Sequence, residues 1–390
     1  MQGVSIKHII FFSLLVFVNV YSFPIFFRIG MDVLLALYVM MLGTLRKHPR
    51  IKTNTIWTIS LFLLVYTVFI SITATKLDYN VLFKPARFLF VLVVFNIITQ
   101  RLHSFTLKEI CISLFLVFLL HVLCVYIEFL IPSTRDLIYS FLEDFQTDEE
   151  DVRLRAKGLC SSYDEAGLVL CVIQSYIYCL FRYRRSKLLF LALLVSIVAS
   201  LLVSRTTMLV SAVFAVIMML SFLKHERGFF FLFIVPVLAI VAYYVYGLVE
   251  LYLAAENLEE SYYSGSAEIL TTDRMLFLPD TAFGIIFGTG KNPVTSDIGY
   301  IKIIHMIGFF GLFVVLFLYY YTFKIIKKVK EIDYNVFLFL FLFLSLLIIF
   351  NYKLLMLYAR GINDLYFLLL FMIINNKHIL YANNKVSRVL

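Results

Sequence analysis

Charged residues are scarce in this sequence. Asp, Glu, Lys and Arg make up 15% of its 390 residues, whereas 62% are hydrophobic and the mean hydropathy is +0.94. Soluble globular domains carry about 25% charged residues, which cover their surface. The composition therefore excludes a water-soluble globule and predicts a polytopic membrane protein.

Cysteine is also sparse, and its positions exclude two further kinds of protein. Only Cys160 lies in a predicted loop, so the chain has no disulfide framework. The cysteines and histidines do not have the spacing of metal ligands. We therefore expect neither a metal site nor another cofactor. The five cysteines are Cys111, Cys124, Cys160, Cys171 and Cys179.

Apolar runs are abundant. Because an open strand cannot satisfy its backbone in lipid, each run that crosses the membrane is predicted to be a helix. We therefore expect an all-α protein with about 12 transmembrane helices in a single transmembrane domain, 1–390. Several runs are shorter than the roughly 20 residues that span a bilayer. The first run lacks a cleavage site and is interpreted as a retained helix. The runs are 8–27, 31–45, 56–74, 87–100, 110–131, 164–181, 188–203, 206–223, 229–248, 299–323, 335–350 and 362–375.

Basic residues gather in alternate connections between these runs. This is the pattern of loops on the cytoplasmic side, and it places both termini in the cytoplasm. The net charge of +9 is then explained by cytoplasmic loops beside anionic lipid, so we expect membrane lipids and no nucleic acid as partners. The basic groups are Arg46, Lys47, Arg50 and Lys52; Arg182, Arg184, Arg185 and Lys187; Lys224 and Arg227; and Lys324, Lys327, Lys328 and Lys330.

The two long connections, 132–163 and 249–298, both fall on the opposite side and are acidic. Long loops are usually functional, so the chemistry is expected outside the cytoplasm. Seven charged residues within or at the ends of helices also come out at this side, although each can simply be snorkelling at the interface. They are Asp32, Glu128, Asp164, Glu165, Arg205, Arg360 and Asp364.

In the first long loop, Arg153, Arg155 and Lys157 alternate ahead of Gly158. Such cations can cradle a phosphate, because guanidinium groups bind its oxygens bidentately. The alternative is a salt-bridged loop in which they neutralise the acidic stretch 148–151. Arg205 is a further candidate, since it interrupts two apolar runs where a charge is costly.

The second long loop contains isolated cations, Arg274 and Lys291, among several glycines. No Gly-Lys-Ser/Thr follows, which excludes a nucleotide phosphate loop. Tyr300 can stack on a sugar or belong to the interfacial aromatic belt. His305 lies close to this region, as a site residue or as a satisfied buried histidine.

The ordered motifs between residues 153 and 311 resemble bacterial O-antigen polymerases, the Wzy family, and more distantly O-antigen ligases. These families share a membrane glycosyltransferase architecture of the GT-C type. The matching elements are Arg155 with Gly158, Ser204-Arg205-Thr206, Arg274, Phe287-Gly288-Thr289-Gly290, and Asp297-Ile298-Gly299-Tyr300 leading to Gly308-Phe309-Phe310-Gly311.

The resemblance implies transfer between undecaprenyl-diphosphate-linked oligosaccharides at the periplasmic face of the bacterial inner membrane. It also implies two long periplasmic loops and a chain-length regulator protein as a partner. It implies that Arg155, Arg205 and Arg274 stabilise the charge of the leaving diphosphate without a metal. Asp297 is the first candidate for the general base, with Asp164 and Glu165 behind it. The substrate-binding candidates are Arg153, Lys157, Lys291, Tyr300, His305 and Arg360.

Two other functions stay open. O-antigen ligases typically carry a histidine three residues before the aromatic that matches Tyr300; Asp297 stands there, which favours a polymerase, while His305 keeps the ligase open. A lipid-linked oligosaccharide flippase or another transporter would favour ionisable groups near the bilayer midplane and short loops on both sides.

Overall fold

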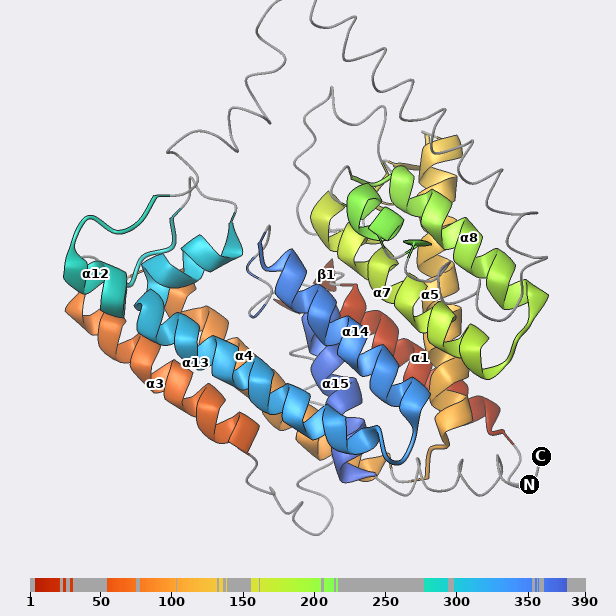
Figure 1. The fold of residues 1–390 in the computed structure, drawn as a ribbon, viewed down its shortest axis with the longest axis horizontal. Helices are drawn as coiled ribbons and strands as arrows, with labels where there is room; N and C mark the ends of the chain where they lie inside the picture. The colour runs from red at the N-terminus through yellow and green to blue at the C-terminus, as the bar shows by residue number, and fades with distance from the viewer. Residues whose placement is uncertain are drawn as a thin grey trace, which may run out of the picture.

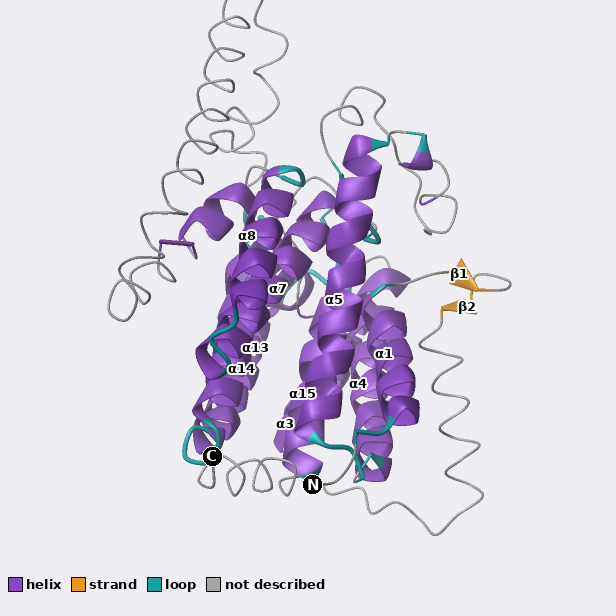
Figure 2. Ribbon diagram, turned by 90° about the vertical axis from the view of Figure 1, so that its right-hand side faces the viewer, coloured by secondary structure: helices purple, strands orange, loops and turns teal. Residues whose placement is uncertain are grey.

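The structure is a computed structural model of the chain. It describes residues 4–21, 24–25, 29–30, 55–74, 78–102, 104–131, 133–135, 138, 156–160, 162–204, 207–213, 215–216, 277–293, 298–352, 355, 357 and 361–376. These residues form a helical bundle, apart from a two-residue antiparallel pair of strands, β1 (Pro24–Ile25) and β2 (Ile29–Gly30). Figure 2 shows the helices standing side by side, with the strands beside the bundle.

Nine of the predicted apolar runs contain a long described helix, and a short helix, α12 (Ala282–Phe287), lies in the second long loop. Five of the nine are long and apolar enough to cross a membrane, and the other four are shorter apolar helices. The protein is therefore a helical membrane-embedded protein. The nine are α1 (Ile6–Val20), α3 (Thr55–Thr73), α4 (Tyr79–Arg101), α5 (Leu107–Leu130), α7 (Tyr163–Tyr183), α8 (Lys187–Leu201), α13 (Gly299–Val329), α14 (Tyr334–Phe350) and α15 (Ile362–Asn375).

Three boundaries differ clearly from the sequence prediction. Helix α1 ends at Val20, ahead of the expected end at 27, and Pro24 and Ile25 form strand β1 instead. Helix α4 begins at Tyr79, ahead of the expected start at 87, because it accommodates Lys84, Pro85 and Arg87 in its first turns. Helix α13 continues to Val329 through the lysines expected to follow it. Of the remaining three runs, 206–223 is helical at 207–213 and 215–216, while 31–45 and 229–248 lie outside the described residues.

The helices pack in two groups joined through α14 and α15 (Figure 1). Helix α3 contacts α4 and α13, and α13 also contacts the short α12. In the other group α1 contacts α5, while α7 contacts α8 and α14. Helix α15 packs on both α4 and α1, so it lies between the groups.

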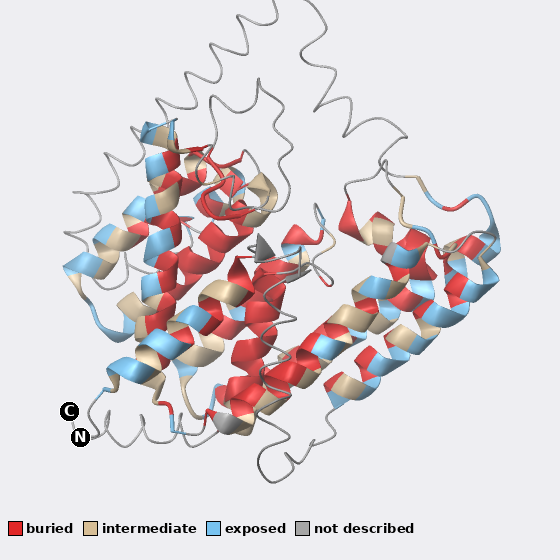
Figure 3. Cartoon of the chain, turned by 180° about the vertical axis from the view of Figure 1, so that it is seen from behind, coloured by how far each residue is buried: buried red, intermediate tan, exposed pale blue. Residues whose placement is uncertain are grey.

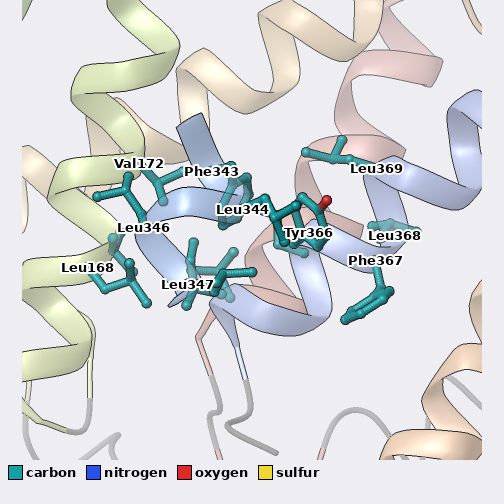
Figure 4. Packing of buried hydrophobic residues seen from close by; sticks show 14 of the residues in the cluster. Leu168, Val172, Phe343, Leu344, Leu346, Leu347, Tyr366, Phe367, Leu368 and Leu369 are labelled. Atoms are coloured by element: carbon teal, nitrogen blue, oxygen red, sulfur yellow. The ribbon is translucent and has the colours of Figure 1, made fainter. Parts of the chain in front are cut away.

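The centre of the bundle is formed by α7 and α15, which are buried over most of their surface (Figure 3). In Figure 4, Leu168 and Val172 of α7 face Leu346 and Leu347 of α14. Helix α3 instead leaves many apolar side chains exposed, which is the pattern of a helix that faces lipid. The exposed residues of α3 are Leu61, Phe62, Val65, Val68, Phe69 and Ile72.

Helix α13 is bent at Gly308, whose φ of 68° and ψ of −178° are not helical. Figure 1 shows its first part, before Gly308, set at an angle to the rest. This first part has its own small apolar cluster of Ile298, Ile301 and Ile304. The bend therefore separates residues 299–307 from the longer remainder of α13.

Candidate functional site

The end of the first long loop is a buried turn, residues 156–160, that fits between the ends of helices. All five residues are buried. The amide of Ala156 donates a hydrogen bond to the carbonyl of Leu202, just after α8, at 2.8 Å. This bond joins the segment that follows Arg155 to the segment that precedes Arg205.

Glu128 fixes the buried turn from the last turns of α5. Its side chain is fully buried, and its Oε2 accepts hydrogen bonds from the amides of Lys157 at 3.0 Å and Gly158 at 2.7 Å. Arg135, 5% exposed, brings its Nε to 4.0 Å from Glu128 Oε1. The carboxylate thus has two amide donors and a cation, which a buried charge requires.

Residue 158 has to be glycine, because both its backbone conformation and its surroundings disfavour a side chain. Its φ is +59°, and a Cβ there would stand 2.9 Å from Val125 Cγ2 and 3.1 Å from His121 Cε1. His121 stacks on Tyr21 with ring centroids 5.4 Å apart. The turn therefore packs against the face of α5 that points into the bundle, close to the end of α1.

Lys157, a predicted substrate-binding residue, is only 5% exposed. Its Nζ lies 6.0 Å from the centre of the Tyr163 ring, at the start of α7. Burial raises the pKa of the neighbouring Cys160 thiol well above its usual range, and the charges of Glu165 and Glu128 act in the same direction. Cys160 is therefore an unreactive packing residue and not a nucleophile.

The start of α7 is the meeting point of three segments. Ser162 caps the helix by accepting a hydrogen bond from the amide of Glu165 at 3.2 Å. A Cβ on Gly167 would lie 1.7 Å from Thr207 Oγ1, and one on Gly361 would lie 2.7 Å from Glu165 Oε1. The segments next to Arg155, Arg205 and Arg360 therefore come together here.

The second long loop packs directly against the bend of α13 at Gly308, and we call this contact between Gly288, Thr289 and α13 the clasp. A Cβ on Gly288, whose φ is +94°, would lie 2.7 Å from the amide nitrogen of Gly308, so the two backbones are in direct contact. In a regular helix the carbonyl of His305 would accept from the amide four residues on. Here it accepts hydrogen bonds from Thr289 across the bend, from the amide at 2.7 Å and the hydroxyl at 2.9 Å.

His305 itself is a buried residue of this clasp, 8% exposed. Its Nε2 lies 3.0 Å from the carbonyl oxygen of Phe277, to which the N–H tautomer donates a hydrogen bond. Its ring also packs against the Phe277 ring at a centroid distance of 4.7 Å. The satisfied buried histidine is thus the interpretation that the geometry favours.

Tyr300 and Lys291 lie beside the group of helices that contains α3, α4 and α13. Tyr300 is half-buried and donates its hydroxyl to the carbonyl of Ile348 at 2.7 Å, tying α13 to α14. Lys291 is exposed. The amide of the next residue, Asn292, donates to Asp78 Oδ2 at 3.2 Å, which ties the loop to the start of α4.

The predicted site residues thus divide into three sets. Lys157 lies beside α5 and α7, whereas Lys291, Tyr300 and His305 lie beside α12 and α13; both places are at one end of the bundle (Figure 1). The other six lie outside the described residues: Arg153, Arg155, Arg205, Arg274, Asp297 and Arg360.

Sequence reasoning noted Glu128 as a charge at a helix end and missed its part in holding the turn. It also missed Arg135 and the ion pair between Arg87 on α4 and Asp364 on α15. A charged residue inside an apolar run needs a partner, and this was the signal in the sequence from which these interactions could have been predicted. Among the described residues no three metal-ligating side chains come together.

Comparison with known proteins found no match for the chain among family models, curated proteins or solved structures.

Proposed function

We propose that this chain is a surface-polysaccharide polymerase of the O-antigen polymerase type, a metal-independent glycosyltransferase with a GT-C-type architecture of about 12 membrane helices. It acts in the bacterial inner membrane, with both termini cytoplasmic. It joins undecaprenyl-diphosphate-linked oligosaccharides at the periplasmic face.

The hydrogen bond from Ala156 to Leu202 is the observation that carries this proposal. Ala156 follows Arg155 directly and Leu202 lies three residues before Arg205. The sequence neighbours of two proposed cations, 50 residues apart in the chain, are therefore in contact at one end of the bundle. Gly361 beside Glu165 supports the addition of Arg360 to the same group.

Such a group suits the departure of a lipid diphosphate. Negative charge grows on the phosphate oxygens as the bond to the anomeric carbon breaks, and fixed cations in a partly dehydrated site stabilise it. In the proposal Arg155, Arg205 and Arg274 have this role, with Arg153 and Lys157 supporting them. Asp297 takes the proton of the acceptor hydroxyl.

The environment of His305 supports a polymerase over a ligase. The imidazole packs on Phe277 and its Nε2 is within hydrogen-bond distance of a backbone carbonyl, so it is occupied within the clasp. The transporter has less support, because the carboxylates of two described buried ion pairs, Glu128 and Asp364, lie near helix ends.

Deleting the gene from its bacterial host tests the proposal. A polymerase predicts that surface glycan falls to a single repeat unit and that long chains return with a plasmid copy. Loss of all surface glycan with lipid-linked units trapped inside would indicate a flippase. Long chains that stay on the lipid carrier would indicate a ligase, and unchanged long surface glycan would refute all three.

A further inference from the structure

Helix α12 in the second long loop has one face packed on protein and one apolar face that the described residues leave exposed. On the packed side Gly284 is buried, and a Cβ there would lie 2.9 Å from Pro279 Cβ. On the other side Phe283, Ile286 and Phe287 are 58%, 49% and 37% exposed. The rings of Phe283 and Phe287 lie 5.0 Å apart between centroids. We call these three exposed residues the α12 patch.

The α12 patch joins the exposed apolar surface of α3 and α13, beside which α12 lies in Figure 1. The hydroxyl of Tyr66 on α3 donates a hydrogen bond to the carbonyl of Phe287 at 3.0 Å. The Tyr66 ring also packs against the ring of Phe310 on α13, with centroids 5.2 Å apart. Phe310 is 42% exposed, and Phe313 further along α13 is 68% exposed. A continuous exposed apolar surface of this kind marks contact with a membrane or a protein.

The chain that leaves α12 lies at the depth of a membrane-spanning helix. Helix α3 is long and apolar enough to cross a membrane over its whole length. Tyr66, which holds Phe287, lies seven residues before Thr73 at the end of α3, or about 10 Å along the axis. A Cβ on Gly290 would lie 3.2 Å from the carbonyl oxygen of Ile70. Residues 287–290 therefore run alongside the last turns of α3 and not beyond its end.

The backbone of this segment suits a lipid environment, in which an unpaired N–H group is costly. The amide of Gly284 donates to Thr281 Oγ1 at 3.0 Å, and the amide of Gly288 donates to the carbonyl of Gly284 at 2.8 Å. The amide of Thr289 is bonded within the clasp. Gly288 and Gly290, which are not helical, are buried against protein, where irregular backbone is tolerated at membrane depth. The exposed part of the segment is the helical part.

We propose that α12 is embedded in the membrane and that the α12 patch contacts the acyl chains of the lipid leaflet at this end of the bundle. No charged residue stands between Asp280 and Lys291, and both of these are exposed. A charge-free stretch between two exposed charges fits a segment whose middle lies in lipid, because charge in hydrocarbon is costly. The lipid contact anchors the second long loop beside α13, whatever reaction the chain carries out.

Tryptophan fluorescence of the full-length protein in phosphatidylcholine nanodiscs tests the proposal. Trp57 is the chain's single tryptophan, so Trp57→Phe gives a background without indole fluorescence. Phe283→Trp in that background places a probe in the α12 patch. Bromine on the acyl chains quenches an indole that touches them, and iodide quenches one that faces water. We expect Phe283→Trp to lose fluorescence when the lipid is brominated and to keep it when iodide is added.

Two matched variants in the same background calibrate the loss. Phe69→Trp, at a position 60% exposed on α3, gives the quenching of a side chain that faces lipid. Lys291→Trp, at an exposed position after α12, gives that of a side chain in water. Phe283→Trp is expected to lose as much fluorescence to brominated lipid as Phe69→Trp does. Ile286→Trp repeats the measurement if Phe283→Trp does not fold.

Two results would overturn the proposal. Quenching of Phe283→Trp by iodide, as for Lys291→Trp, would place the α12 patch in water. Protection from both quenchers would mean that a second copy of the chain or another protein covers the patch. Neither measurement depends on glycan length, so the result is separate from the test of the proposed function.

Discussion

The amide of Ala156 donates a hydrogen bond to the carbonyl of Leu202 at 2.8 Å, so the first long loop returns to the bundle directly beside the turn after α8. Both segments are apolar at the contact, since Ala156 and Val203 are fully buried. The basic residues that precede Ala156 and follow Ser204 are therefore attached to two buried segments that are in contact with each other.

Replacing Arg155, Arg205 or Arg274 with Ala is expected to leave the protein in the membrane and to shorten surface glycan to a single repeat. Loss of one cation from an anion site costs about 3–4 kcal/mol of barrier, or a rate loss of roughly 10²–10³. Because Arg155 and Arg205 act on one phosphate in the proposal, the double variant should lose much less than the product of the two effects. Gel analysis of glycan length measures this, with exposed Arg184→Ala as the control. Long polymer in all three single variants would contradict the assignment.

Replacing Glu128 with Ala is expected to loosen the buried turn. The substitution leaves two buried amides without their acceptor and removes the negative charge beside Arg135, a loss of about 3–5 kcal/mol of stability. Thermal unfolding in detergent measures this change. Glu331→Ala is the control, since Glu331 is exposed between α13 and α14. Equal unfolding temperatures for the two variants would show that the turn does not depend on Glu128.

Replacing Gly308 with Ala is expected to disrupt the clasp between α13 and the second long loop. The residue has a φ of +68°, and a Cβ would lie 2.2 Å from the backbone oxygen of Ile286, which has little room to move. Positive φ alone costs about 1–3 kcal/mol for a residue with a side chain.

Gly311→Ala is the matched comparison for this prediction. It lies one turn further along the same helix, outside the left-handed region, and its Cβ would meet the Ile307 side chain, which can shift. Gly308→Ala should therefore lower the unfolding temperature more than Gly311→Ala does. The opposite order would argue against a fixed bend.

Replacing either Arg87 or Asp364 singly is expected to destabilise the contact between α4 and α15. Their side chains are 18% and 3% exposed, so each substitution leaves a partly buried charge without its counter-ion. The loss is about 3–5 kcal/mol for one partner removed. The double variant Arg87→Met with Asp364→Leu should lose less than the sum of the two singles, which a double-mutant cycle of unfolding free energies measures. Additive losses would mean that the two groups do not interact.

The predicted orientation can be tested by labelling single introduced cysteines. Lys291→Cys should react with a membrane-impermeant maleimide in intact spheroplasts, because Lys291 is exposed on a loop assigned to the outer side. Lys328→Cys, exposed on the predicted cytoplasmic side, should react only after permeabilisation. The unmodified chain gives the background, which should be low since Cys160 is buried with a raised pKa. The reverse labelling pattern would place both termini outside the cytoplasm.

Much of the helical framework could be predicted because hydrophobic runs have to be helical in lipid. The observed helix boundaries differ from the predicted ones where polar residues belong to a helix, as Lys84 and Arg87 belong to α4. The apolar run is then shorter than the helix. The short helix α12 was not predicted, because its six residues lie among glycines in a loop. Gly288 and Gly308 were recognised as parts of two motifs, but their contact across 20 residues was not visible in either.

The sequence by itself determined the membrane class, most helix positions and the residue types suited to binding a phosphate, because these follow from hydropathy and from the cost of charge in lipid. Tertiary structure alone decided which of those residues are neighbours. It brought Glu128 to Gly158, Thr289 to the carbonyl of His305, and Arg87 to Asp364. The physical reason is that these contacts depend on how helices pack and where α13 bends, and side-chain packing between distant segments leaves no local pattern in the chain.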